Sequence, residues 1–264
     1  MEVWKAIVVG IVQGLSEFLP ISSSGHIALT QFLLGMREAG VDHEGDITFE
    51  LVLHLGTFLS VVVYFRRKLW ELFLALIGKG EAADRQMIGL LIVATVPATV
   101  AYLLFKDFFE GAYNNPRLVS GLLIVTGVVL LLPKLYRAPE QKFGMKQALW
   151  MGVAQAFAIL PGISRSGSTI TAGLMSGSSP AKAAEFSFLM FLPAIGGGTL
   201  LKAKEMMEAA NGASAGAYGA GFVAAFLSGL AAVYLVLRVI KRGKFQYFAY
   251  YCFVIGVVGM LYPW

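Results

Sequence analysis

The chain is poor in charged residues and has a single cysteine. Charged side chains make up 14% of its 264 residues and hydrophobic ones 57%, whereas a soluble domain carries about 25% charge. Too little polar sequence remains to cover a soluble core, which excludes an ordinary soluble domain and indicates an integral membrane protein. Cys252 has no second cysteine with which to form an intramolecular disulfide.

Several common functional motifs are also absent. The sequence contains no Walker A, CxxC, HExxH or GxSxG pattern, so it lacks the usual signatures of P-loop, thiol redox, zinc protease and α/β-hydrolase chemistry. The first five residues lack the basic region and cleavage site of a signal peptide, and we expect no processing. The net charge of +5 does not indicate nucleic acid, because membrane proteins carry excess Lys and Arg on the cytoplasmic side.

Long apolar runs predict an all-α polytopic membrane protein. A helix needs about 20 apolar residues to cross about 30 Å of hydrocarbon. Six runs approach this length and predict six transmembrane helices: 49–65, 87–105, 118–135, 184–201, 218–240 and 245–263. Two further stretches, 3–36 and 147–177, are interrupted by Pro-Ile-Ser and Pro-Gly-Ile-Ser, and each predicts a re-entrant hairpin of two half-helices. The short stretch 70–77 is flanked by charge and predicts an interfacial helix.

Basic residues predict the orientation of these helices. Lys and Arg gather in three segments that should be cytoplasmic: 66–85, 134–146 and 238–244. Three other segments then lie outside, together with the C-terminus: 38–46, 106–117 and 202–218. The first hairpin enters from outside and the second from the cytoplasm. The two halves of this single membrane domain, about 1–136 and 146–264, therefore form an inverted-topology repeat.

A repeated serine-rich motif marks the two interrupted stretches. The pattern Ile-Ser-x-Ser-Gly occurs at 21–25 and again at 163–167, each time after a Gln at the same offset, Gln13 or Gln155. Inverted repeats with broken helices place their sites near the midplane of the bilayer, so both loops should meet there. Together they supply a carboxylate, an imidazole, a guanidinium and hydroxyl groups, a set that indicates an anion site and phosphate chemistry.

Gln13 and Glu17 are candidate ligands of a cation. They lie four residues apart, on one face of the half-helix before Pro20, and could hold one cation together. An ionisable residue inside a membrane segment is costly and indicates function. The alternative is a Glu17 that caps a helix or pairs with Arg165 to hold the hairpins together.

The first loop offers candidate catalytic residues. Ser22, Ser23 and Ser24 should begin the second half-helix, whose free N–H groups attract anions, although each serine also suits a helix cap. His26 lies three residues after Ser23 and four after Ser22, within reach of either hydroxyl. A base beside a hydroxyl is the basic unit of nucleophilic catalysis. A structural histidine with satisfied hydrogen bonds is the alternative.

Arg165 is the strongest candidate for binding phosphate. Its permanently charged, planar guanidinium matches two phosphate oxygens. Neighbouring hydroxyls would complete a cradle: Ser164, Ser166, Ser168 and Thr169. A salt bridge to Glu17 without any ligand is the alternative. Glu50 and His54 share a helix face, and we interpret them as an interfacial pair rather than as the lining of an entrance.

The two motifs resemble the signatures of the undecaprenyl-diphosphate phosphatases of the bacitracin-resistance (BacA) type. The resemblance rests on 13–26 and 161–169 and covers the whole chain. It implies a multi-pass enzyme of the bacterial inner membrane that removes the terminal phosphate of undecaprenyl diphosphate, which recycles the lipid carrier for cell-wall glycan synthesis. It also implies Mg²⁺ or Ca²⁺ and a site open to the periplasm. The family motif has Glu or Gln, three residues, then Glu; with Gln13 at the first position, Glu17 is the only carboxylate there.

Under this hypothesis Ser23 attacks the terminal phosphorus while His26 manages its proton, and Ser22 or water are alternative nucleophiles. The partners expected are the prenyl diphosphate lipid and membrane lipid, and a homodimer is a compatible assembly. A secondary transporter or flippase for a phosphate-bearing lipid or small anion is an alternative function. A lipid phosphatase of the acid-phosphatase superfamily is less favoured, because Thr171 occupies the place of a required His.

Overall fold

The computed structural model describes residues 1–36, 44–201 and 215–264, and within these ranges all regular structure is helical. The all-α prediction is confirmed. In chain order the helices are α1 (Val3–Phe18), α2 (Ser23–Leu33), α3 (Glu44–Tyr64), α4 (Arg66–Leu76), α5 (Ala82–Ala112), α6 (Pro116–Leu135), α7 (Met145–Phe157), α8 (Arg165–Met175), α9 (Pro180–Leu201), α11 (Ala215–Lys241) and α12 (Tyr247–Leu261).

The long apolar helices make the chain a multi-pass membrane protein. Among the described residues, α5, α6 and α11 are each long and apolar enough to cross a bilayer, with a mean hydropathy of 2.2 in their most apolar windows. The helices α3 and α4 reach this threshold only together and are bent by 81° where they join, while α12 is a shorter apolar helix. The structure therefore has three spans by length and composition, or four if the bent pair counts as one.

Both interrupted stretches fold as pairs of short helices, as predicted. The helix α1 stops at Phe18, just before Pro20, and α2 begins after Ser22, whose φ of 70° turns the chain. In the second pair, Gly162 makes the corresponding turn with a φ of 97°, a conformation that glycine adopts without strain. Ser22 and Ser164 then cap α2 and α8, because each Oγ accepts a hydrogen bond from a backbone N–H three residues later.

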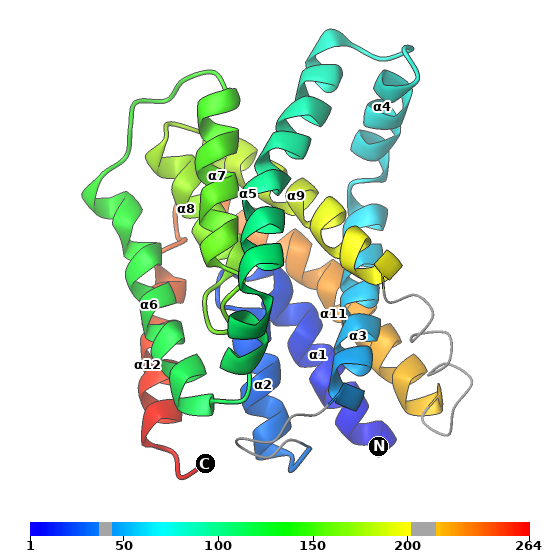
Figure 1. The fold of residues 1–264 in the computed structure, drawn as a ribbon. Coiled ribbons are helices and arrows are strands. Elements are labelled where there is room, and N and C mark those ends of the chain that lie inside the picture. Colours follow the sequence, from blue (N-terminus) through cyan, green and yellow to red (C-terminus); the bar gives the residue numbers. More distant parts are fainter. Residues whose placement is uncertain (37–43, 202–214) are drawn as a thin grey trace.

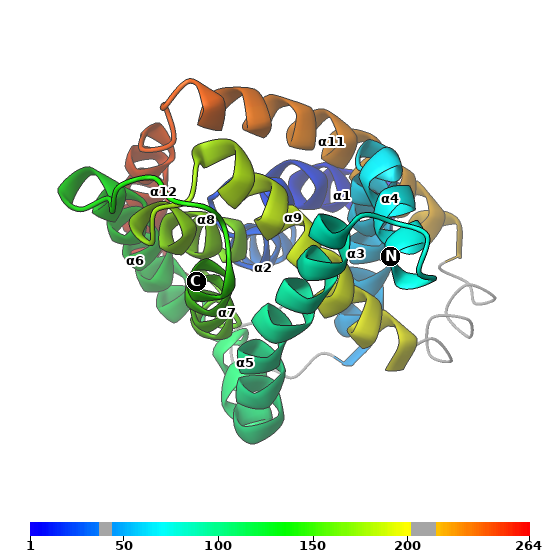
Figure 2. The ribbon, with the colours of Figure 1, turned by 90° about the horizontal axis from the view of Figure 1, so that it is seen from above.

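The two short pairs approach each other from opposite ends of the molecule. In Figure 1 the pair α1 and α2 occupies the lower part and the pair α7 and α8 the upper part. Seen from above in Figure 2, they lie toward the centre, with α5, α6, α11 and α12 around them. Their loops touch, because Ser166 Oγ donates a hydrogen bond to the Leu19 carbonyl at 3.1 Å. The fold thus brings the repeated motifs into contact.

Close packing fixes the first pair in place. Glycines on α1 allow it to lie directly against α11: a Cβ added at Gly14 would stand 2.5 Å from the Ala225 carbonyl oxygen. At the end of α1, Phe18 packs edge-on against Phe188 and Phe191 of α9, with ring centroids 5.6 and 5.8 Å apart. The residue before this aromatic anchor is Glu17.

One predicted loop is wrong, and others fall outside the described residues. The helix α5 continues past the predicted run 87–105, through a kink at Phe105 (φ −126°, ψ 26°), to Ala112. The connection predicted for 106–117 is therefore confined to 113–115. The predicted external loops 38–46 and 202–218 lie largely outside the described residues. The stretch 70–77 falls mainly within α4, and its interfacial position stays a prediction.

Candidate active site

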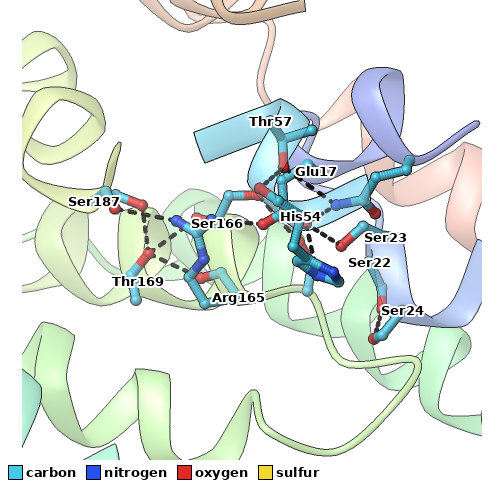
Figure 3. A network of polar contacts seen from close by, with 12 residues as sticks. Glu17, Ser22, Ser23, Ser24, His54, Thr57, Arg165, Ser166, Thr169 and Ser187 are labelled. Carbon is cyan, nitrogen blue, oxygen red and sulfur yellow. Dashed lines mark hydrogen bonds and ion pairs between the residues drawn. The ribbon is translucent and has the colours of Figure 1, made fainter. Parts of the chain in front are cut away.

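The two helix pairs bring Glu17 and Arg165 into direct contact. Arg165 Nη2 donates to Glu17 Oε1 at 2.7 Å, and the two side chains are only 16% (Arg165) and 6% (Glu17) exposed. Figure 3 shows them pointing toward each other from the two halves of the chain. A buried charge is costly unless it is paired, so this contact stabilises both residues and joins the two hairpins. The two loops are in contact, as expected.

The second oxygen of the Glu17 carboxylate faces a different set of groups. Ser23 Oγ donates to Oε2 at 2.6 Å, and Gln13 Nε2 donates to it at 3.0 Å. His54 Nε2 lies 3.6 Å away from the same atom. Glu17 therefore binds a guanidinium through Oε1 and a hydroxyl and an amide through Oε2 (Figure 3).

Gln13 carries an unsatisfied oxygen. Its side chain is fully buried, and its Nε2 also contacts Thr57 Oγ1 at 3.3 Å, but Oε1 has no hydrogen-bond partner in the described part of the chain. A buried carbonyl oxygen without a partner costs about 1–3 kcal/mol. A free amide oxygen next to a carboxylate supplies the two oxygen ligands expected at a site for a hard cation.

The described residues contain no cluster of three or more His, Cys, Asp or Glu side chains able to hold a metal ion. Mg²⁺ commonly needs no such cluster, because it binds through one or two carboxylates together with water and substrate phosphates. Gln13 and Glu17 therefore fit a cation that substrate helps to hold.

The second loop holds the guanidinium in a fixed orientation. Arg165 Nη1 donates to the Ser187 carbonyl at 3.1 Å, and the guanidinium lies over the Phe191 ring, 4.7 Å from its centroid. Thr169 Oγ1 donates to the Arg165 carbonyl at 2.8 Å and shares a 2.7 Å hydrogen bond with Ser187 Oγ. Thr169 thus lies beside Arg165 as predicted, while Ser187 is a member of this network that the motifs did not indicate.

The other predicted serines occupy several positions around this centre. Ser22 and Ser164 are the caps described above, and their Oγ atoms lie 3.3 Å from those of Ser24 and Ser166 respectively. Ser168 points elsewhere: it lines a separate, largely apolar cavity of about 610 Å³ between α6, α7 and α8. The cap interpretation is confirmed for Ser22, and the structure shows that Ser164 is a cap too. Phosphate binding by these serines stays a prediction.

His26 does not make the expected contact with a serine hydroxyl. Its Nδ1 bonds the Ser22 carbonyl at 2.8 Å, and its Nε2 bonds the Tyr251 hydroxyl at 2.9 Å. The ring also stacks on Tyr251, with centroids 5.5 Å apart. The Ser22 carbonyl already bonds Nδ1 and Tyr251 already bonds Nε2, so neither ring nitrogen is left for a serine hydroxyl. His26 therefore anchors the start of α2.

His54 is a second site residue, besides Ser187, that the sequence interpretation did not place at this centre. The sequence interpretation paired His54 with Glu50 at the membrane interface; in the structure His54 Nδ1 bonds the Glu50 backbone carbonyl at 2.8 Å, and Nε2 faces Glu17. Thr57, one turn later on α3, reaches Gln13 on the same side. An ionisable residue within an apolar span was the available signal, but the sequence does not show which helix that face of α3 meets.

Comparison with known proteins agrees with the two motifs. The family model described as "Bacitracin resistance protein BacA" matches residues 6–258. An undecaprenyl-diphosphatase of Syntrophotalea carbinolica is 46% identical over 268 residues, covering 99% of this chain and 98% of the relative. One from Salinibacter ruber is 42% identical over 275 residues, covering 98% and 99%, and one from Christiangramia forsetii is 38% identical over 268 residues, covering 100% and 99%. The chain therefore belongs to the bacitracin-resistance protein BacA family.

Proposed function

We propose that this protein hydrolyses undecaprenyl diphosphate to undecaprenyl phosphate and inorganic phosphate, which recycles the lipid carrier for cell-wall glycan synthesis and contributes to bacitracin resistance. The observation that carries the proposal is the Glu17 carboxylate, which binds Arg165 with one oxygen and the Ser23 hydroxyl with the other. The buried Glu17 carboxylate thus holds both the Arg165 guanidinium, which can bind phosphate, and the Ser23 hydroxyl, which can act as a nucleophile. The full-length undecaprenyl-diphosphatase relatives support the same activity.

Ser23 is the proposed nucleophile. Its Oγ–H already donates to Glu17 Oε2 at 2.6 Å, and the residue is only partly buried at the start of α2. As Oγ attacks the terminal phosphorus, its proton passes to Glu17, and the bond from that phosphorus to the bridging oxygen breaks to release undecaprenyl phosphate. Water then attacks the phosphoserine, releases inorganic phosphate and restores the hydroxyl. In this scheme Glu17 takes the proton that the sequence interpretation assigned to His26.

Arg165 and the helix starts hold the charge of the diphosphate. The guanidinium donates to Glu17 through Nη2 and to the Ser187 carbonyl through Nη1, and phosphate oxygens would replace part of this arrangement. The first residues of α2 and α8 face the same centre, where free backbone N–H groups favour an anion. Thr169 and the capping serines shape this cradle. Catalysis then depends mainly on positioning and preorganised charge.

Gln13 and Glu17 would hold the divalent cation, Mg²⁺ or Ca²⁺. The cation would neutralise phosphate oxygens during transfer. The orphaned Oε1 of Gln13 supports this assignment, because it supplies a second oxygen next to the carboxylate.

The finer topology is part of the same proposal. We infer six full spans and two re-entrant hairpins, arranged as an inverted repeat of about 1–136 and 146–264 in the bacterial inner membrane, with the site open to the periplasm. Each predicted run coincides with a helix, and the two short pairs enter from opposite ends in Figure 1. These observations support the arrangement, and the basic segments supply its direction.

Phosphate release from undecaprenyl diphosphate tests the function. Purified full-length protein in detergent should release phosphate with Mg²⁺ or Ca²⁺ and lose this activity with a chelator. Absence of release from folded, cation-supplied protein would contradict the proposal, and movement of the lipid across proteoliposome bilayers would then identify a transporter.

A further inference from the structure

His54 is an ionisable side chain next to Glu17 that the proposed mechanism does not use. It projects from α3 and is 20% exposed, with Nε2 3.6 Å from Glu17 Oε2. Its Nδ1 bonds the Glu50 carbonyl at 2.8 Å. Because a carbonyl oxygen can only accept, Nδ1 carries the hydrogen, and in the neutral imidazole Nε2 presents a free lone pair to the carboxylate.

This arrangement is typical of a metal-binding histidine. A histidine that ligates a metal almost always donates its other ring N–H to a carboxylate, a backbone carbonyl or water, which fixes the ring and its tautomer. In the neutral imidazole this lone pair faces a buried carboxylate oxygen 3.6 Å away, which is unfavourable because both atoms are electron-rich. Either a proton on Nε2 or a metal cation between Nε2 and Oε2 removes that conflict, and only the metal leaves the Nδ1–H and the carboxylate arranged as in a ligand set.

Gln13 supplies the third group around the same point. Its amide nitrogen lies 3.0 Å from Glu17 Oε2, while the amide oxygen is buried without a partner. A half-turn of the amide would exchange the two atoms and place the oxygen beside the carboxylate. Neighbouring oxygens in an octahedral shell at about 2.1 Å from a cation are themselves about 3 Å apart. The existing spacing therefore suits two ligands of one ion.

We propose that His54 Nε2 is a third protein ligand of the divalent cation, beside Gln13 Oε1 and Glu17 Oε2. The inference deepens the proposed function and rests on its cation site. A nitrogen ligand suits Mn²⁺, Co²⁺ or Zn²⁺ better than Ca²⁺, which takes oxygen ligands. Each of these ions should therefore bind the free protein more tightly than Ca²⁺ does.

Electron paramagnetic resonance with Mn²⁺ alone tests this ligand directly. Tag-free, full-length protein is titrated with Mn²⁺, and the bound ion is examined for electron spin-echo modulation by a coupled nitrogen, with and without ¹⁵N-histidine labelling. We expect nitrogen modulation that changes with the label. His54→Gln should remove it and weaken Mn²⁺ binding at least about tenfold. His26→Gln, a matched change at a histidine bonded to Tyr251, should preserve both.

Wild-type protein that binds Mn²⁺ without a histidine signal would overturn the proposal, and this result depends on no variant. A signal that survives in thermally stable His54→Gln protein would also overturn it. Phosphate release from undecaprenyl diphosphate, measured on the same wild-type preparation, separates the two proposals. A histidine signal without phosphate release would contradict the proposed function and support His54 as a ligand. Phosphate release without the signal would support the function and contradict His54 as a ligand.

Discussion

The two oxygens of Glu17 give one side chain two tasks. Through Oε1 the carboxylate pairs with the buried guanidinium of Arg165, and through Oε2 it accepts a hydrogen bond from Ser23 Oγ. Loss of the carboxylate charge would leave Arg165 buried and unpaired, which costs about 3–5 kcal/mol. Variants at Glu17 therefore affect stability as well as catalysis, and Ser23 gives a cleaner test of the chemical step.

We expect Ser23→Ala to lower kcat for phosphate release by at least about 10³-fold, as for other nucleophile deletions. The substitution removes the attacking oxygen and one hydrogen bond to Glu17. Ser24→Ala is the matched control, because Ser24 Oγ shares a hydrogen bond with Ser22 Oγ and does not contact Glu17 in the described part of the chain. Its kcat should stay within about tenfold of wild type, the cost of one hydrogen bond. A Ser23→Ala protein with a tenth of the wild-type kcat or more would indicate direct attack by water.

At the level of single residues the motifs identified the main participants. Glu17, Ser23 and Arg165 are predictable because each sits in a polar break within apolar sequence. His54 and Ser187 are not, since each lies in an unbroken apolar helix and reaches the site only through packing between helices. The role expected of His26 depended on a rotamer, which spacing along a helix does not determine.

The helix pairs depend on close backbone packing. Gly14 faces α11, and a Cβ there would overlap Ser228 Oγ and lie 2.5 Å from the Ala225 carbonyl oxygen. We expect Gly14→Ala to destabilise the protein by about 1–3 kcal/mol, the usual cost of overpacking. Because Glu17 stands one turn further along α1, the same shift should also lower phosphate release. Thermal unfolding in detergent and kcat together measure both effects.

Gly89→Ala is the control for this element. The site lies in α5, and a Cβ there meets nothing within 4 Å. Alanine favours a helix over glycine by about 1 kcal/mol, so the unfolding temperature should stay level or rise. Equal destabilisation by both substitutions would argue against close contact between α1 and α11.

Element boundaries were predictable where the backbone chemistry changes. Pro20 and Gly162 interrupt apolar sequence, and the helices before them end at Phe18 and Phe157, within five residues. The extension of α5 past Phe105 was not predictable, because the charged residues that follow resemble a loop while the helix continues through a kink. The 81° bend between α3 and α4 likewise falls between aromatic and basic residues, without proline or glycine.

On the scale of the whole molecule, the proposed inverted repeat predicts which segments face each side of the membrane. The only cysteine among the described residues, Cys252, is buried, so single cysteines in a Cys252→Ser background report accessibility. A membrane-impermeant maleimide on intact cells should label a cysteine at exposed Arg117 and spare those at Arg67, Lys142 and Lys244, which are also exposed and are predicted to lie on the cytoplasmic side. Permeabilised cells provide the control, because all four positions should then react. Equal labelling of Arg67 and Arg117 in intact cells would contradict the topology.

The repeated motif was enough to predict that the two loops meet. How the halves meet could not be derived from sequence, because it depends on Phe18 packing against α9 and on the hydrogen bond from Ser166 to the Leu19 carbonyl. These contacts determine which side chains lie around Glu17 and Arg165.

The central claim is that Glu17 from one half and Arg165 from the other act as one unit on the diphosphate. A double-mutant cycle on kcat/KM for undecaprenyl diphosphate, with Glu17→Gln, Arg165→Lys and the combination, tests it most directly. Residues that act together are strongly non-additive. We predict that the double variant is no more than about tenfold slower than the slower single variant. A double variant whose loss equals the product of the two single losses would contradict a shared site.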